Sequence, residues 1–126
     1  MDAPVDLTVS VRRGSPLLLP GASPVAGAEE ARRAERLAGE LSNLEPLVRV
    51  AVTEAGAGDV PMFSVASRAS PGAVRFVGVP RVNLFRALLE AVRRASTGDH
   101  GRAPGWAEAL VQLPRPVHAR VFATPT

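Results

Sequence analysis

The sequence predicts an α/β fold in which a strand–helix–strand (βαβ) unit is followed by a hairpin and a helix (ββα). Three features predict it: a period-two apolar pattern near the N-terminus, two stretches with a helical apolar stripe, and a Pro-Gly turn between two short strand-like runs. Strands joined through a helix are expected to be parallel with a right-handed crossover, and hairpin strands antiparallel. At 126 residues the chain is long enough to bury one core.

The first half of the chain predicts a strand, a helix and a second strand. Residues 5–12 alternate apolar and polar side chains, which is typical of a half-buried strand. Ser23-Pro24 offers a hydroxyl cap and a proline at the first helical position. From Ala28 an apolar stripe at helical spacing continues until Pro46. Residues 47–52 are apolar except for one arginine, and this pattern predicts a mostly buried strand.

The second half predicts a hairpin, a helix and a C-terminal strand-like run. Residues 62–68 and 73–77 read as strands joined by the turn 69–72. A helix with an apolar stripe opens near Asn83, and a short helical turn is expected over 104–113. Residues 116–122 again alternate in the manner of a strand.

These patterns also predict the core. We expect the sheet to be covered by helices on both faces, so that its middle strands need apolar residues on both sides. The residues expected to be mostly buried are Val9, Val11, Leu37, Leu41, Val48, Val50, Phe63, Val65, Phe76, Leu84, Leu88 and Val92.

Composition and charge exclude several classes of function. All fifteen basic residues are arginine, and the formal net charge is only +3, with acidic and basic residues interspersed along the first helical stretch. Few aromatic residues are available to interleave with a basic stripe, so no nucleic-acid partner is expected. No apolar run approaches the roughly 18 residues of a membrane span, so no membrane partner is expected. Since the start of the chain lacks a basic secretory signal and the sequence has no cysteine, a cytoplasmic location is the expectation.

Four stretches carry a resemblance to a known family. Residues 60–65, 72–80 and 83–92, together with the tail 116–126, resemble protein disulfide oxidoreductases built from two thioredoxin-like (glutaredoxin-like) folds. They are similar also to the N-terminal region of the flavoprotein subunit of alkyl hydroperoxide reductase. Both families fuse two such folds and commonly keep the catalytic cysteines in the second. The resemblance implies a thioredoxin-like fold with a shortened or missing helix between its second and third strands.

The resemblance also implies a domain organisation and a degenerate active site. Residues 1–98 would form a thioredoxin-like domain lacking Cys-x-x-Cys, and 99–126 a linker helix and the orphan first strand of a second thioredoxin fold. The two vestigial cysteine positions would lie near Pro16 and Leu19. Pro61 would be a cis-proline beside this vestigial site, where it would help to bind a substrate peptide. No catalytic residue and no cofactor are expected, because thiol–disulfide exchange needs a thiolate.

Other candidates for chemistry are weak. His100 lies in a Gly-rich loop pattern, and His118 has no second histidine or acidic residue near it in the sequence. Because a metal site needs several convergent ligands, no metal is expected. The expected partner is a protein, either a catalytic thioredoxin-like fold or a second copy of this chain.

Two functions remain open at the level of sequence. The first is a redox-inactive structural or interaction module of a protein concerned with cell redox homeostasis. The alternative is the N-terminal part of an active thiol–disulfide oxidoreductase whose Cys-x-x-Cys lies beyond Thr126. As the chain stands it is not expected to be an enzyme, since it contains no cysteine.

Overall fold

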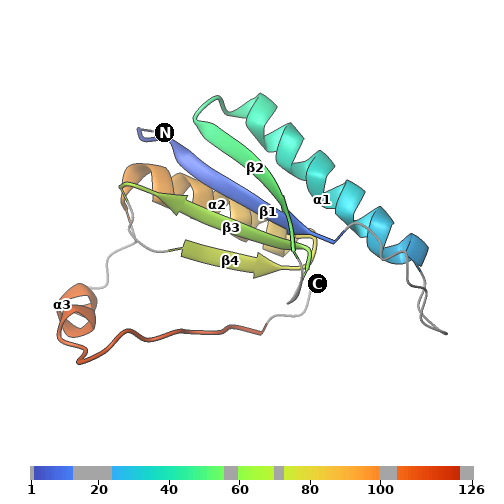
Figure 1. The fold of residues 1–126 in the computed structure, drawn as a ribbon. Helices are drawn as coiled ribbons and strands as arrows, with labels where there is room; N and C mark the ends of the chain where they lie inside the picture. Colours follow the sequence, from blue (N-terminus) through green and yellow to red (C-terminus); the bar gives the residue numbers. More distant parts are fainter. Residues whose placement is uncertain (1, 13–23, 56–59, 70–72, 100–104, 123–126) are drawn as a thin grey trace.

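The computed structural model is an α/β arrangement of one four-stranded mixed sheet and three helices (Figure 1). It describes residues 2–12, 24–55, 60–69, 73–99 and 105–122, without the side chains of 24–27, 106 and 107. In chain order the elements are β1 (Val5–Val11), α1 (Pro24–Leu44), β2 (Val48–Glu54), β3 (Met62–Ser67), β4 (Ala73–Val77), α2 (Asn83–Thr97) and α3 (Trp106–Val111). The predicted βαβ and ββα units are thereby confirmed.

The strands lie in the order β2-β1-β3-β4. β1 runs parallel to β2, which it reaches through α1, and antiparallel to β3. β3 and β4 form the predicted antiparallel hairpin, in which Phe63 lies opposite Phe76. Residues 55–61 connect β2 to β3, and those described contain no helix; 56–59 lie outside the described residues. β1 is therefore a central strand between two neighbours, and β2 and β4 form the edges of the sheet.

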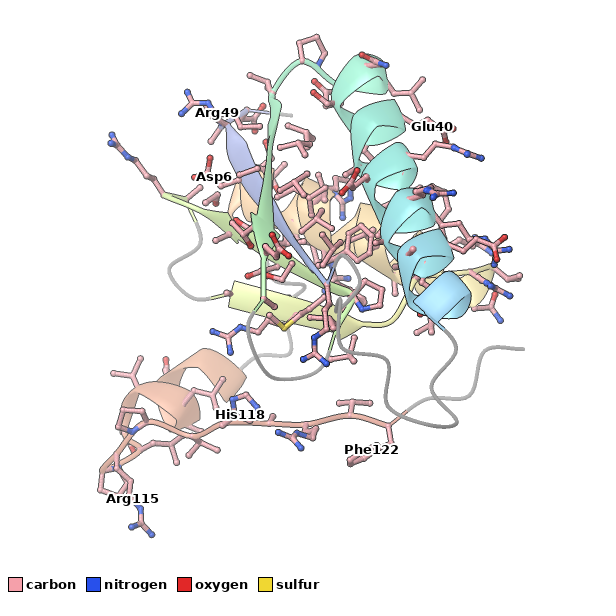
Figure 2. All side chains as sticks on the ribbon, turned by 45° about the vertical axis from the view of Figure 1, so that its right-hand side comes forward. Asp6, Glu40, Arg49, Arg115, His118 and Phe122 are labelled. Carbon is pink, nitrogen blue, oxygen red and sulfur yellow. The ribbon has the colours of Figure 1, made fainter. Side chains whose placement is uncertain are left out.

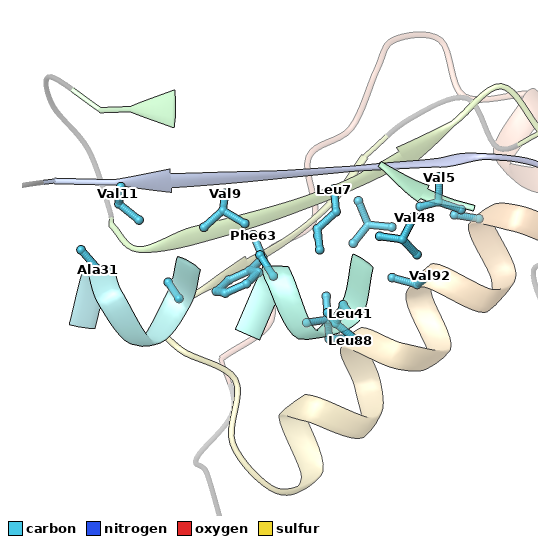
Figure 3. Packing of buried hydrophobic residues seen from close by; sticks show 14 residues of the cluster. Val5, Leu7, Val9, Val11, Ala31, Leu41, Val48, Phe63, Leu88 and Val92 are labelled. Carbon is cyan, nitrogen blue, oxygen red and sulfur yellow. The ribbon is translucent and has the colours of Figure 1, made fainter. Parts of the chain in front are cut away.

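The core lies between the sheet and the two long helices. The side chains of Val5, Leu7, Val9 and Val11 on β1 are almost fully buried, and they point toward α1 and α2 (Figure 3). Phe63 and Val65 on β3 lie on the same side of the sheet. The other side of β1 carries Asp6, Thr8 and Ser10, which are exposed or half-buried.

The prediction that helices cover both faces of the sheet is wrong for the described residues. α1 and α2 pack on one face, and α3 packs on neither, since each of its described side chains is exposed. The physical reason is the short connection between β2 and β3, which leaves no described helix to cover the second face. Most of the side chains on that face are polar or small, and water can solvate them.

Most of the predicted core residues are buried. Val9, Val11, Leu41, Val48, Phe63, Val65, Leu88 and Val92 are buried, whereas Leu37, Val50, Phe76 and Leu84 are half-buried. The apolar stripe expected to continue until Pro46 ends earlier, because Leu44 at the end of α1 is exposed. Ala31, Ala34 and Ala38 line the buried side of α1, and such short side chains let the helix approach the sheet closely.

Two serine hydroxyls tie the end of α2 to the sheet. Ser96 is 1% exposed, and its Oγ accepts the backbone N–H groups of Asp2 (2.9 Å) and Ala3 (3.0 Å) and donates to the Ala3 carbonyl (2.7 Å). The hydroxyl of Ser67, the last residue of β3, donates to the Ala95 carbonyl. The chain before β1 and the end of β3 are thereby held to the same helical turn, which fixes how α2 lies across the sheet.

The C-terminal segment is outside the core. Residues 112–122 form neither helix nor strand, and all of them are exposed. Residues 116–122, the segment expected as the orphan first strand of a second fold, therefore lie outside this core, and 123–126 lie outside the described residues. The strand expected there is not formed, because no strand of the described sheet pairs with it.

Two glycines provide a test of how α2 ends. Gly98 terminates α2 with φ 70°, and a Cβ there would lie 3.2 Å from the Ala69 carbonyl oxygen. We expect Gly98→Ala to lower the free energy of unfolding by about 1–2 kcal/mol, because a side chain disfavours the left-handed conformation. Gly39 lies inside α1 with open space around it. Gly39→Ala should instead raise the stability by about 0.5–1 kcal/mol. Urea denaturation of both variants measures the difference, and equal effects would contradict the helix end described here.

Candidate functional site

The candidate site is the face of the sheet that no described helix covers, which we call the open face. Cross-strand register places three rows of side chains on it, each running from β2 through β1 and β3 to β4. The rows are Arg49, Asp6, Ala66 and Ala73; then Ala51, Thr8, Ser64 and Arg75; then Thr53, Ser10, Met62 and Val77.

The open face combines small hydroxyl-bearing side chains with charges at its margins. Ser10 and Thr53 on neighbouring strands share a hydrogen bond of 3.2 Å between their hydroxyls. Arg49 lies on the edge strand β2, next to Asp6 on β1, on the side of the sheet away from α1 (Figure 2). Arg75 lies on the other edge strand, β4. The face therefore carries hydrogen-bonding hydroxyl groups, with an arginine on each edge strand and one carboxylate on β1.

Of the residues singled out from the sequence, Pro61 is described and Pro16 and Leu19 are not. The Val60–Pro61 peptide bond is cis, which is the isomer expected from the resemblance. Pro61 is buried just before β3, and its carbonyl accepts the backbone N–H of Gly78 (2.7 Å). Its role in binding stays a prediction, because Pro16 and Leu19 lie outside the described residues.

The histidines do not form a site in the described part of the chain. His118 lies on the exposed C-terminal segment (Figure 2), and His100 lies outside the described residues. Among the residues that the structure describes, no three His, Asp or Glu side chains are grouped to hold a metal ion.

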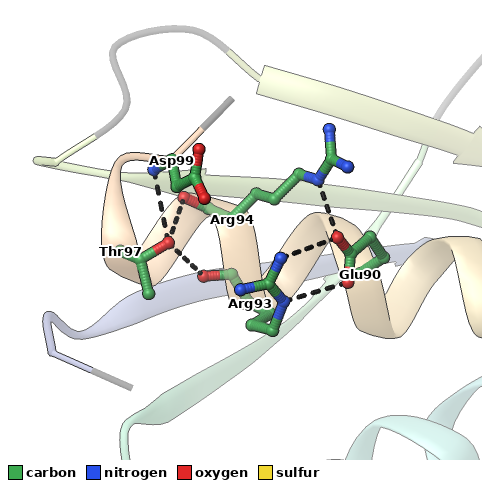
Figure 4. Close-up of polar contacts among 5 residues, drawn as sticks. All are labelled: Glu90, Arg93, Arg94, Thr97 and Asp99. Carbon is green, nitrogen blue, oxygen red and sulfur yellow. Dashed lines mark hydrogen bonds and ion pairs between the residues drawn. The ribbon is translucent and has the colours of Figure 1, made fainter. Parts of the chain in front are cut away.

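Among the described residues, a cluster of charged side chains with shifted pKa values lies on the surface of α2 (Figure 4). Glu90 accepts hydrogen bonds from Arg93 and Arg94, both with a shortest distance of 2.8 Å. These bonds, first that of Arg93 and then that of Arg94, lower the pKa of Glu90 to about 2, and Glu90 in turn raises the pKa of Arg93. A lowered carboxyl pKa stabilises the fold above the ordinary glutamate pKa, and this contribution is lost as the pH falls toward 2. All three groups are solvent-exposed, so the cluster supports the helix weakly, as does the Arg33–Glu29 pair on α1.

The open face was not recognised from the sequence as a site. The sequence did contain the residues that form this face. They are the polar residues of the β1 alternation, Asp6, Thr8 and Ser10, and Arg49, the one polar residue in the apolar run 47–52. Period two places such residues on one face of a strand, but it does not show whether a helix covers that face.

Comparison with known proteins adds no assignment, because neither a protein-family model nor a curated protein matches the chain. Within the described ranges, none of the helices has both the length and the apolar character needed to cross a bilayer. The candidate site therefore rests on the geometry of the sheet.

Adjacent residues of β1 test whether one face of the sheet is uncovered. Thr8→Lys places the new ammonium on the open face, where water reaches it, so the free energy of unfolding should change by no more than about 1 kcal/mol. Val9→Lys places the same group in the core, where Val9 is fully buried. An unpaired buried charge should cost about 3–5 kcal/mol or prevent folding. Chemical denaturation measures both, and a Thr8→Lys variant as unstable as Val9→Lys would show that the second face is covered.

Proposed function

We propose that this chain is a redox-inactive thioredoxin-like module that acts by binding another protein. The observation that carries the proposal is the sheet order β2-β1-β3-β4, with β1 parallel to β2 and a β3–β4 hairpin leading into α2. This order and these directions are those of the fold that the sequence resembles. The helix between the second and third strands of that fold is the part with no counterpart among the described residues.

This chain contains no thiol group that could perform the redox chemistry of that fold. Thiol–disulfide exchange proceeds by attack of a thiolate on a disulfide sulfur, and the sequence contains no cysteine. At the two positions that correspond to the active cysteines by the resemblance, Pro16 and Leu19 supply neither a thiol nor another nucleophile. A binding role therefore fits the chain better than catalysis of disulfide exchange.

The open face is the surface that this proposal assigns to the partner. Its central side chains, such as Thr8 and Ser64, are short and carry hydroxyls, so that a partner surface can approach closely and form hydrogen bonds. Two arginines against one aspartate give the face a net positive charge, which favours an acidic contact surface on the partner. The resemblance points to a catalytic thioredoxin-like fold as that partner.

The resemblance of residues 116–126 to the first strand of a second thioredoxin fold supports a second candidate. In this alternative, the chain is the N-terminal part of a thiol–disulfide oxidoreductase whose Cys-x-x-Cys follows Thr126. The complete exposure of 116–122, outside the core of the first fold, fits that reading. The binding proposal is compatible with it, because the partner fold would then belong to the same polypeptide.

The purified chain should not catalyse disulfide reduction. We expect the rate of insulin reduction by dithiothreitol to equal that of buffer alone, since no thiolate is available. A thioredoxin with an intact Cys-x-x-Cys, assayed in parallel, is the positive control. A rate above buffer that grows with the concentration of this chain would contradict the proposal.

Position-specific photo-crosslinking in cells tests the open face as the binding surface. A photoreactive residue replaces Ser64 on the open face in one variant, and Arg36 on the exposed side of α1 in the other. We expect the Ser64 variant to yield an adduct whose partner peptide belongs to a Cys-x-x-Cys thioredoxin-like fold, and the Arg36 variant to yield none. Equal yields at the two positions, or a different partner class at Ser64, would refute this assignment.

A further inference from the structure

The outer edge of β4 is open and poorly protected against pairing with another strand. In the described sheet β4 pairs only with β3, so the backbone groups on its other side have no strand partner. Val74 and Val77 are 53% and 61% exposed, and Phe76 is half-buried at the margin of the core. Natural edge strands are commonly protected by proline or by several charges, and this one carries only Arg75.

The segment 117–122 has the complementary properties. Val117, Ala119 and Val121 alternate with His118, Arg120 and Phe122, which is the pattern of a strand with one apolar side. All six residues are exposed, and Phe122 is 87% exposed. Burial of these exposed apolar side chains against another apolar surface would be favourable in free energy.

Topology disfavours pairing of this segment with β4 of its own chain. Figures 1 and 2 show the segment after α3 passing on the β4 side of the sheet, in the same direction as β4. β1 and β4 point the same way, and α1 and α2 cover the same face. The right-handed crossover from β1 leads to β2, on the opposite side of the sheet from β4. A connection from β4, over the same helix-covered face, to a parallel strand on the outer side of β4 would therefore be left-handed. Connections between parallel strands of one sheet are almost always right-handed.

We propose that residues 117–122 of one copy add as a strand to the β4 edge of a second copy. Val117, Ala119 and Val121 would then lie on the helix-covered side, beside Val74 and Phe76 of the other copy. An antiparallel register with His118 opposite Arg75 places Ala119 beside Val74 and Val117 beside Phe76. It also keeps Arg120 from facing that arginine, since like charges directly opposite destabilise a sheet. Reciprocal exchange of the two segments makes a closed dimer with two identical contacts.

The β4 edge suits this strand better than the β2 edge. On its helix-covered side β4 offers Val74 and the half-buried ring of Phe76, both of which an added strand would cover. On the same side β2 also carries Val50 and Val52, but this edge strand ends in Glu54, which would be desolvated beside an apolar residue of the tail.

Sedimentation equilibrium of the full chain tests the self-association. Val117→Glu places a charge in the pairing segment, whereas Leu110→Glu places one on α3, at a position of similar exposure (60% against 68%). We expect a concentration-dependent dimer whose dissociation constant rises about tenfold or more in Val117→Glu and is unchanged in Leu110→Glu. A chain that stays monomeric at millimolar concentration, or equal effects of the two variants, would overturn the proposal.

Disulfide trapping tests which edge strand pairs with the segment 117–122. Because the sequence has no native cysteine, only the introduced cysteines can form disulfides. Ala119→Cys chains are mixed and oxidised with Val74→Cys chains or with Val52→Cys chains, the latter on the β2 edge. We expect the Val74 pair to give at least about five times the yield of mixed dimer obtained with the Val52 pair, because only β4 would bring the two sulfurs within bonding range. Equal yields would refute the choice of edge. Ring closure within single chains of the Ala119→Cys/Val74→Cys double variant at high dilution would refute pairing between copies.

Discussion

The two-sided character of β1 is the constraint on which the rest of the structure depends. This central strand buries Val5, Leu7, Val9 and Val11 against both long helices, while Asp6, Thr8 and Ser10 lie on the opposite face. Because side chains alternate with a period of two, a register shift of one residue would bury the aspartate and expose the core. The pairing of β1 with β2 and β3 then determines where every other side chain of the sheet points.

The same constraint produces both surfaces on which the functional proposals rest. The polar side chains of β1 and the side chains beside them on β2, β3 and β4 make up the open face. This is the face proposed to bind a protein, and its side chains supply no thiolate for disulfide exchange. The two sheet edges follow from the strand order. Both leave apolar side chains partly exposed, Val52 on β2 (42%) and Val74 (53%) on β4. Under the proposed function, the chain would keep the frame of the thioredoxin-like fold that its sequence resembles and would use these surfaces for association.

Local patterns predicted the elements well, and long-range packing was harder to predict. The β1 alternation, the Pro-Gly turn of the hairpin and Pro24 at the start of α1 are short-range signals, and each element lies within a few residues of its expected bounds. The role of Ser96 in holding α2 to the chain before β1 was not predicted. A helical serine is expected to be solvated unless a distant backbone segment, here Asp2 and Ala3, is known to lie beside it. The uncovered face was missed because periodicity shows which residues share a face, and only the tertiary fold shows what covers it. Residues 116–122 illustrate the same point, since a strand pattern forms no strand without a partner.

The central claim is that α1 and α2 cover one face of the sheet and that no described helix covers the other. Nuclear Overhauser effects between methyl groups in the full chain test it most directly, because they report proton pairs only a few ångströms apart. The account predicts cross-peaks from the methyl groups of Leu7 and Val9, taken together, to side chains of both α1 and α2. From the Thr8 methyl it predicts cross-peaks only to sheet neighbours such as Ala51. Cross-peaks from the Thr8 methyl to any helical side chain would contradict it.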